Sequence, residues 1–156
     1  MNEIDIARLA AYIDGEGCIL ITRKCSTGKN NHGRKYHFLR VVVGNTDPRL
    51  MSWLKNTFGG YINTQMRNLS KNSRRVSFTW IVHSKAAEDL LRFCMPYFVM
   101  KQGQAALALE YRDTYGEKVG RKGLGPDIFE IREGYRIKLS EMKKEVGTLL
   151  SVKGDD

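Results

Sequence analysis

One acidic side chain near the N-terminus is placed where it could do chemistry. Glu16 lies between Gly15 and Gly17, at the point where a helical pattern should end. Glycines permit a tight turn there, so the carboxylate can be presented at the foot of the helix. Carboxylate oxygens are ligands that Mg²⁺ prefers. An isolated glutamate is ordinarily a solvated charge, so a catalytic role depends on what surrounds Glu16.

The helix that precedes this glutamate has two different faces. Bulky apolar side chains recur at Ile6, Leu9 and Ile13, which is a helical spacing. Small residues on another face let two helices approach closely, so two copies of the chain could pack across a two-fold axis. We expect Asp14 to act structurally in this contact. The predicted dimer interface comprises Ala7, Ala10, Ala11 and Asp14.

The stretch Leu9 to Gly17 resembles the nine-residue signature of the LAGLIDADG homing endonucleases. Five positions match outright, namely Leu9, Ala10, Ile13, Asp14 and Gly17. Glu16 replaces one carboxylate by another, whereas Ala11, Tyr12 and Gly15 depart within small or apolar classes. The resemblance continues at Asn45 to Pro48, Phe58 to Ile62 and Met95 to Gln102, and covers about residues 4–115.

The resemblance implies a site-specific endonuclease that binds a long, partly palindromic duplex DNA site as a homodimer. It implies hydrolysis of both strands, short 3′ overhangs, and Mg²⁺ with Mn²⁺ as a substitute. Glu16 and the Gly15 carbonyl would bind the metal. Lys101 would face the cleavage pocket and Asn45 would order the solvent, with Arg49 as a further candidate. The ordinary alternatives are a solvated lysine and a helix-start hydrogen bond.

Three other functions stay open. Members of this family can serve as intron-splicing maturases that bind RNA, and degenerate relatives act as DNA-binding regulators without cleavage. The third reading is a structural or protein-interaction module. Retention of Glu16 and Lys101 favours cleavage.

The pattern of elements predicts an α+β fold in the order αββαββα. We expect one domain over residues 1–150 and a short tail at 151–156, with an antiparallel, saddle-shaped sheet covered by helices on one face. The expected helices span residues 4–14, 48–58, 84–94, 101–115 and 126–144, so that extra helices follow the core fold. The expected strands span residues 18–24, 36–43, 61–68 and 74–82.

Alternation along the strands predicts one apolar and one polar sheet face. The inward residues are Ile19, Ile21, Leu39, Val41, Val43, Ile62, Thr64, Met66, Phe78, Trp80 and Val82. The outward, DNA-binding candidates are Leu20, Thr22, Lys24, Tyr36, Phe38, Arg40, Asn63, Gln65, Arg67, Arg75, Ser77 and Thr79. Loop residues Lys29, Arg34, Lys35, Lys71 and Arg74 would contact phosphates. A plain solvated sheet face is the alternative.

Composition supports a polyanionic partner. The chain has 26 Lys and Arg against 17 Asp and Glu, which gives a formal charge of +9. Three cysteines without a CxxC pair favour reduced, buried thiols, and neither a secretion signal nor a membrane span is recognisable. We therefore expect an intracellular protein with no membrane partner. The three histidines lack metal-ligand spacing, so a zinc site is not expected.

Overall fold

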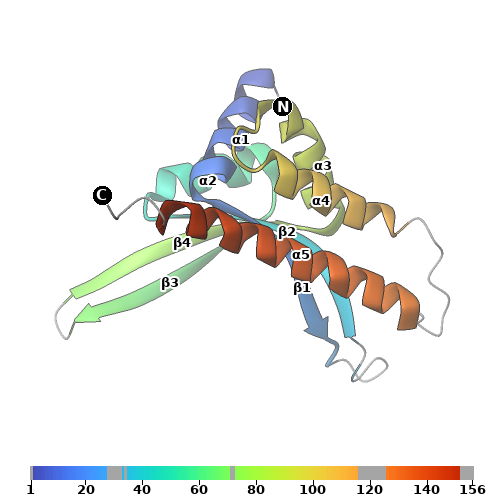
Figure 1. Cartoon of the computed structure of the whole chain (residues 1–156). Helices are drawn as coiled ribbons and strands as arrows, with labels where there is room; N and C mark the ends of the chain where they lie inside the picture. The colour runs from blue at the N-terminus through green and yellow to red at the C-terminus, as the bar shows by residue number, and fades with distance from the viewer. Residues whose placement is uncertain (1, 28–32, 34, 71–72, 116–125, 152–156) are drawn as a thin grey trace.

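The computed structural model consists of a four-stranded sheet and helices that cover one of its faces (Figure 1). It describes the backbone of residues 2–27, 33, 35–70, 73–115 and 126–151, and the side chains of these residues except 67–70, 73–75, 126 and 145–151. The predicted α+β class and order are confirmed. The elements are α1 (Glu3–Glu16), β1 (Gly17–Cys25), β2 (Lys35–Asn45), α2 (Pro48–Phe58), β3 (Tyr61–Ser70), β4 (Ser73–His83), α3 (Ser84–Cys94), the 3₁₀ helix η1 (Met95–Tyr97), α4 (Gln102–Asp113) and α5 (Pro126–Ser151).

The sheet is antiparallel throughout, with the strand order β1-β2-β4-β3. Its central register aligns Ile19 with Val41 and Val41 with Val82, so the inward side chains form continuous rows. The β1–β2 and β3–β4 hairpins diverge below the helices, and the sheet arches like a saddle (Figure 1). Among the described elements, none covers the concave side of this arch.

The predicted inward face is confirmed at the centre of the sheet. Ile19, Leu39, Val41, Val43 and Trp80 are all 0% exposed and pack against helices on the convex side. The prediction is wrong near the far end of β3, where Thr64 is exposed and Met66 is 70% exposed. The β3–β4 hairpin extends beyond the helices there, so both faces of the strand meet solvent.

The end of α1 differs from the prediction. The helix continues through Glu16, so Gly15 is helical and does not form a turn. The chain turns at Gly17, where an added Cβ would lie 2.5 Å from the Cα of Ile13. Glycine is therefore required at Gly17, which joins the helix directly to β1.

Gly60, immediately before β3, is the second glycine on which the fold depends. Its φ is +79°, and an added Cβ would lie 2.5 Å from the carbonyl oxygen of Ile81. We expect Gly60→Ala to lower the free energy of unfolding by about 2–3 kcal/mol, since both a left-handed conformation and a backbone clash are imposed. Urea unfolding measures this loss. Gly134→Ala in α5 is the matched control, because nothing lies within 4 Å of that added Cβ; equal midpoints for the two variants would contradict this backbone geometry.

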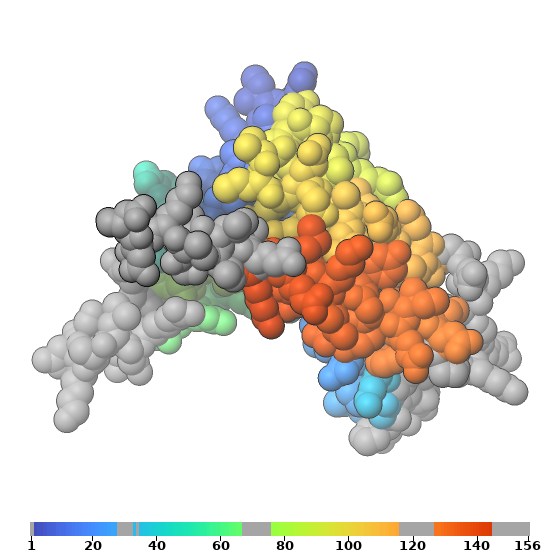
Figure 2. Space-filling model, viewed as in Figure 1, coloured from blue at the N-terminus to red at the C-terminus, as the bar shows by residue number. Residues whose placement is uncertain are grey.

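The C-terminal helix α5, whose partners the sequence did not indicate, packs against α4 and the β1–β2 hairpin (Figure 2). Arg132 is only 2% exposed; it stacks on the ring of Tyr115 at 3.7 Å and donates to the carbonyl of Thr114 at 2.9 Å. Lys143 donates to the carbonyl of Ile19, in the edge strand β1, at 2.5 Å. The helix thus covers an edge strand that would otherwise expose unpaired backbone groups.

Glu133 connects α5 to the buried ring of His37 in β2. The Oε2 atom of Glu133 lies 2.6 Å from Nε2 of His37, while Oε1 accepts from Arg136 at 2.6 Å. Arg136, followed by His37 and Arg23, lowers the pKa of Glu133 from its ordinary value of 4.5 to about 2, against the opposing effect of burial. The ionised carboxylate is therefore stabilised in the folded state.

The pH dependence of stability should reveal this carboxylate. Because its pKa is lowered on folding, Glu133 stabilises the fold above pH 4.5, and this contribution is lost as the pH falls from 4.5 toward about 2. We expect the free energy of unfolding of the wild type to fall more steeply over that range than that of Glu133→Gln, which is already weaker at neutral pH. Urea unfolding at a series of pH values measures both slopes. Parallel slopes would show that Glu133 contributes nothing by its charge.

The cysteines carry free thiols, of which Cys94 is buried, Cys18 is partly exposed and Cys25 is exposed. Burial raises the pKa of the Cys94 thiol to about 12. The prediction of buried thiols is therefore confirmed for Cys94 and wrong for Cys18 and Cys25. In the described part of the chain, no helix has the length and apolar character that a membrane crossing requires.

Candidate active site and nucleic-acid interface

Glu16 is exposed at the C-terminal end of α1, and Asn45 at the end of β2 lies beside it. The strand register pairs Gly17 with Val43, which brings Asn45 next to the last residue of the helix. The Asn45 Nδ2 atom donates a hydrogen bond to Glu16 Oε2 at 2.5 Å. Among the described residues this is the one hydrogen-bond partner of the carboxylate, so its other oxygen is open to a ligand.

The side-chain amide of Asn45 is fixed at both ends. Its Oδ1 atom accepts from the backbone N–H of Asp47 at 2.8 Å, which leaves the NH₂ group directed at Glu16. Asp47 in turn caps α2 by accepting from the backbone N–H of Arg49 at 2.8 Å. Asn45 therefore makes the helix-start hydrogen bond and holds the glutamate at the same time.

Lys101 lies at the same end of α1. Its Nζ atom donates to the carbonyl oxygen of Asp14, which places a positive charge at the C-terminus of the helix. The carboxylate of Asp14 accepts backbone N–H bonds from Val99 at 2.7 Å, from Met100 at 3.3 Å and from Lys101 at 2.9 Å. Glu16, Asn45 and Lys101 thus surround one end of α1.

These contacts correct the predicted role of Asp14. It is 6% exposed, and three backbone amides of its own chain occupy its carboxylate. Asp14 therefore anchors the segment before α4 inside the chain, and has little surface left for a partner. The expectation that it has a structural role holds in this different form.

Arg49 does not contact Glu16. Its guanidinium pairs with Asp47 at 2.6 Å, and its side chain is 90% exposed. The hydrogen bonds from Arg49 lower the pKa of Asp47 to about 2. Arg49 therefore contacts the N-cap of α2, and it is linked to Glu16 only indirectly, through Asp47 and then Asn45.

The exposed face of α1 carries a stripe of small residues with a spacing of four. Ala11 and Gly15 are exposed and Ala7 is partly exposed, whereas Ala10 is 0% exposed. Ala10 belongs to the chain's own core with Leu9 and is unable to reach a partner, which corrects its predicted interface role. Nothing lies within 4 Å of a Cβ added at Gly15, so the stripe is open at its lower end.

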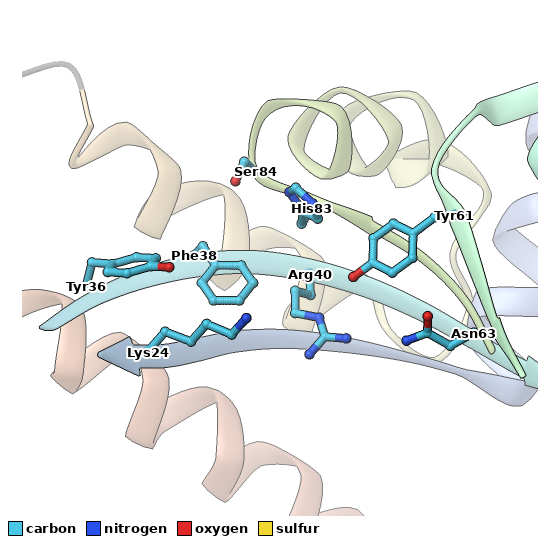
Figure 3. A pocket seen from close by; sticks show the side chains of 8 residues that line it. All are labelled: Lys24, Tyr36, Phe38, Arg40, Tyr61, Asn63, His83 and Ser84. Atoms are coloured by element: carbon cyan, nitrogen blue, oxygen red, sulfur yellow. The ribbon is translucent and has the colours of Figure 1, made fainter. Parts of the chain in front are cut away.

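The concave face of the sheet is hollowed between the hairpins. The hollow has a volume of about 470 Å³, and its lining comes from β1, β2, β3 and the junction of β4 with α3 (Figure 3). The sequence pattern missed Tyr61, His83 and Ser84. Tyr61 lies two residues before Asn63, and His83 lies four residues after Thr79, so continuing the alternation along each strand would have found both. The lining residues are Lys24, Tyr36, Phe38, Arg40, Tyr61, Asn63, His83 and Ser84.

The other DNA-binding candidates fall into three groups. Leu20, Thr22, Ser77 and Thr79 are partly exposed, and Lys35 and Gln65 are exposed. Arg67, Arg74 and Arg75 lie in the described backbone of β3 and β4. Lys29, Arg34 and Lys71 lie outside the described residues, as do the loop at 116–125 and the tail at 152–156.

An arched antiparallel sheet, bare on its concave side and carrying a carboxylate at the foot of a packed helix, defines a class of α+β fold. Among solved structures, this is the fold of the LAGLIDADG homing endonucleases. The archaeal intron-encoded homing endonuclease I-Vdi141I complexed with DNA matches with a TM-score of 0.66 and 12% identity over 89% of this chain and 84% of that one. The homing endonuclease I-CvuI, in complex with the I-CreI target in the presence of Mg, matches with a TM-score of 0.64 and 15% identity over 88% and 81%.

A third structure differs in coverage. The LAGLIDADG homing endonuclease I-SmaMI bound to cleaved DNA matches with a TM-score of 0.64 and 17% identity, over 85% of this chain but 42% of that one. No family model matches the sequence, and a search of curated proteins found no match. At these identities the likeness establishes the fold, and it agrees with the motif resemblance at Leu9 to Gly17.

Proposed function

We propose that the protein is a site-specific DNA endonuclease that works as a homodimer and hydrolyses both strands of a long, partly palindromic duplex, leaving short 3′ overhangs. The observation that carries the proposal is the position of Glu16. Its carboxylate is exposed at the end of α1 and held by Asn45, Lys101 is bound to the Asp14 carbonyl at the same end of the helix, and solved examples of the fold include endonucleases complexed with DNA.

Dimerisation is part of this proposal, because one chain supplies one such carboxylate. Within the described residues, no group of three or more His, Cys, Asp or Glu side chains could hold a metal ion. The small-residue stripe Ala7, Ala11 and Gly15 lets a second α1 approach closely, which would bring two Glu16 side chains toward the axis. The 42% coverage of I-SmaMI supports the need for two copies of this unit, since two such units would span the length of that protein.

The residues at this end of α1 fit a divalent metal ion. Carboxylate and carbonyl oxygens are the hard donors that Mg²⁺ and Mn²⁺ take, and one Glu16 oxygen is open. Glu16 and the Gly15 carbonyl would hold the ion, with DNA phosphates and the second chain completing its coordination. A bound Mg²⁺ supplies an acidified water and charge stabilisation of the leaving oxygen. Solved complexes of I-CvuI were obtained in the presence of Mg or Ca.

The chain's own residues have separate roles in cleavage. Asn45 holds the glutamate oriented, since its amide is fixed by the backbone of Asp47. Lys101 places a positive charge at the same end of α1 as Glu16, from which it would stabilise a phosphate during strand cleavage. The concave sheet face would hold the duplex, with its cationic and polar side chains divided between phosphates and base edges. An intracellular location is part of the proposal.

The test is selection from a randomised duplex library with the full chain. We expect enrichment of a long, partly palindromic site in Ca²⁺, and cutting of both strands of that site when Mg²⁺ replaces Ca²⁺. A reaction without metal is the control. Tight binding of a structured intron RNA with no DNA cutting would overturn the proposal in favour of a splicing maturase, and duplex binding without cutting would favour a regulator.

A further inference from the structure

The hollow on the concave face has walls made of interlocked rings. The ring centroid of His83 lies 6.2 Å from that of Phe38, in an edge-on contact, and 6.0 Å from that of Tyr61. The His83 ring therefore connects the β2 wall to the β3 wall. Tyr36 extends the row at 6.0 Å from Phe38. Rings that brace one another lose little freedom when a ligand enters, so this hollow has a preformed shape.

Arg40 occupies the middle of the hollow. Its guanidinium lies between the side chains of Lys24 and Asn63, with the rings of Phe38 and Tyr61 to either side (Figure 3). The Nε atom is buried and has no hydrogen-bond partner among the described residues, which leaves the two terminal nitrogens as the accessible donors. No carboxylate is among the described residues that line the hollow, so within this part of the chain these donors lack an acidic partner.

We propose that this hollow reads one G·C base pair in each half-site, with the terminal nitrogens of Arg40 donating to O6 and N7 of the guanine. The inference rests on the proposed DNA-binding function and adds a sequence preference to it. A guanidinium matches the two guanine acceptors in the major groove. Adenine offers one acceptor and one donor there. An arginine that approaches adenine with both terminal nitrogens would therefore leave one N–H group without an acceptor.

The surroundings of Arg40 favour a base edge over a phosphate. A phosphate is held by exposed cations that approach it from several directions, as Lys24 is placed to do at the rim, 5.7 Å above the ring of Phe38. Arg40 is partly buried between rings that would pack against thymine methyl groups at the edges of neighbouring bases. Its partial burial strengthens directional hydrogen bonds and makes a wrong base costly.

The experiment compares the sites that the wild type, Arg40→Met and Lys24→Gln select from a randomised duplex library in Ca²⁺. We expect a guanine preference of roughly 5- to 150-fold at one position per half-site in the wild type. Arg40→Met keeps an unbranched stem but has no donor, so it should lose that preference while retaining the rest of the site. Lys24→Gln loses the same charge, but it should weaken all sites alike and reduce the salt dependence.

A chemical probe separates this contact from any effect on folding. Replacing the selected guanine by 7-deazaguanine removes N7, so it should weaken binding by the wild type but not further weaken binding by Arg40→Met. An unchanged guanine preference in Arg40→Met, or equal losses for both proteins with the modified base, would overturn the inference alone. Failure of the wild type to enrich any duplex would overturn the proposed function, and this inference with it.

Discussion

Replacing Glu16 by glutamine should reduce Mg²⁺-dependent cutting of the selected duplex by on the order of 10³-fold or more, because the substitution removes the charge that binds the metal and keeps the shape. Binding of the duplex in Ca²⁺ should stay within about threefold, since the phosphate and base contacts lie on the sheet. The hydrogen bond from Asn45 can be retained by the glutamine oxygen. Single-turnover cleavage and gel-shift titrations measure the two quantities.

The matched control is Glu130→Gln, which removes an exposed glutamate from α5, far from α1 in the sequence. That variant should cut like the wild type. Full cutting by Glu16→Gln would show that the Glu16 carboxylate is not part of the catalytic site. Loss of binding together with cutting would instead mean that Glu16 supports the fold or the DNA contact.

Replacing Gly15 by leucine should convert the protein to a monomer in solution. Within one chain the new side chain meets open space, because nothing lies within 4 Å of the added Cβ, and leucine favours the helix by up to about 1 kcal/mol over glycine. At a two-fold helix contact, the same side chain appears twice and separates the backbones. We expect the dimer to weaken by about 100-fold or more.

Analytical ultracentrifugation over a range of concentrations measures this change, and urea unfolding checks that the chain remains folded. Gly134→Leu is the matched control, since Gly134 is also helical and exposed, with open space around its Cβ. It should leave the association constant unchanged. A Gly15→Leu protein that dimerises like the wild type would place the interface elsewhere.

The centre of the fold could be predicted from the sequence because Arg40 marks the outward face of its strand. Leu39 and Val41 lie on either side of Arg40 and therefore point inward, and Val43 continues that face. The same logic fails at Met66, which continues the alternation into a part of the hairpin that no helix reaches. Strand patterns give the face of a residue but not how far the covering helices extend.

The helix contact shows a similar limit. Small residues on α1 indicated a close approach, but the buried arc of the helix is wide enough to include Ala10, and the exposed stripe runs through Gly15 instead. The spacing of apolar residues gives the direction of the buried face and not its width. Its edges depend on α3 and η1, which the chain forms some 80 residues later and packs against α1.

The residues of the site could be predicted from the sequence, but the contacts between them could not. Glu16 and Lys101 are far apart in the sequence, and the contact that joins them runs through the backbone of Asp14. The three hydrogen bonds that the Asp14 carboxylate accepts from backbone N–H groups leave no signature in the sequence. The hydrogen bond from Asn45 to Glu16 likewise follows from the β1–β2 register, which was not assigned from the sequence alone.

The central claim is that two chains, each contributing one Glu16, form the active unit on DNA. Native mass spectrometry of the wild-type protein on its selected duplex, together with sequencing of the strands cut when Mg²⁺ is added, tests it directly. The account predicts two protein chains per duplex and a cut in each strand. A single chain per duplex that still cuts both strands would contradict it.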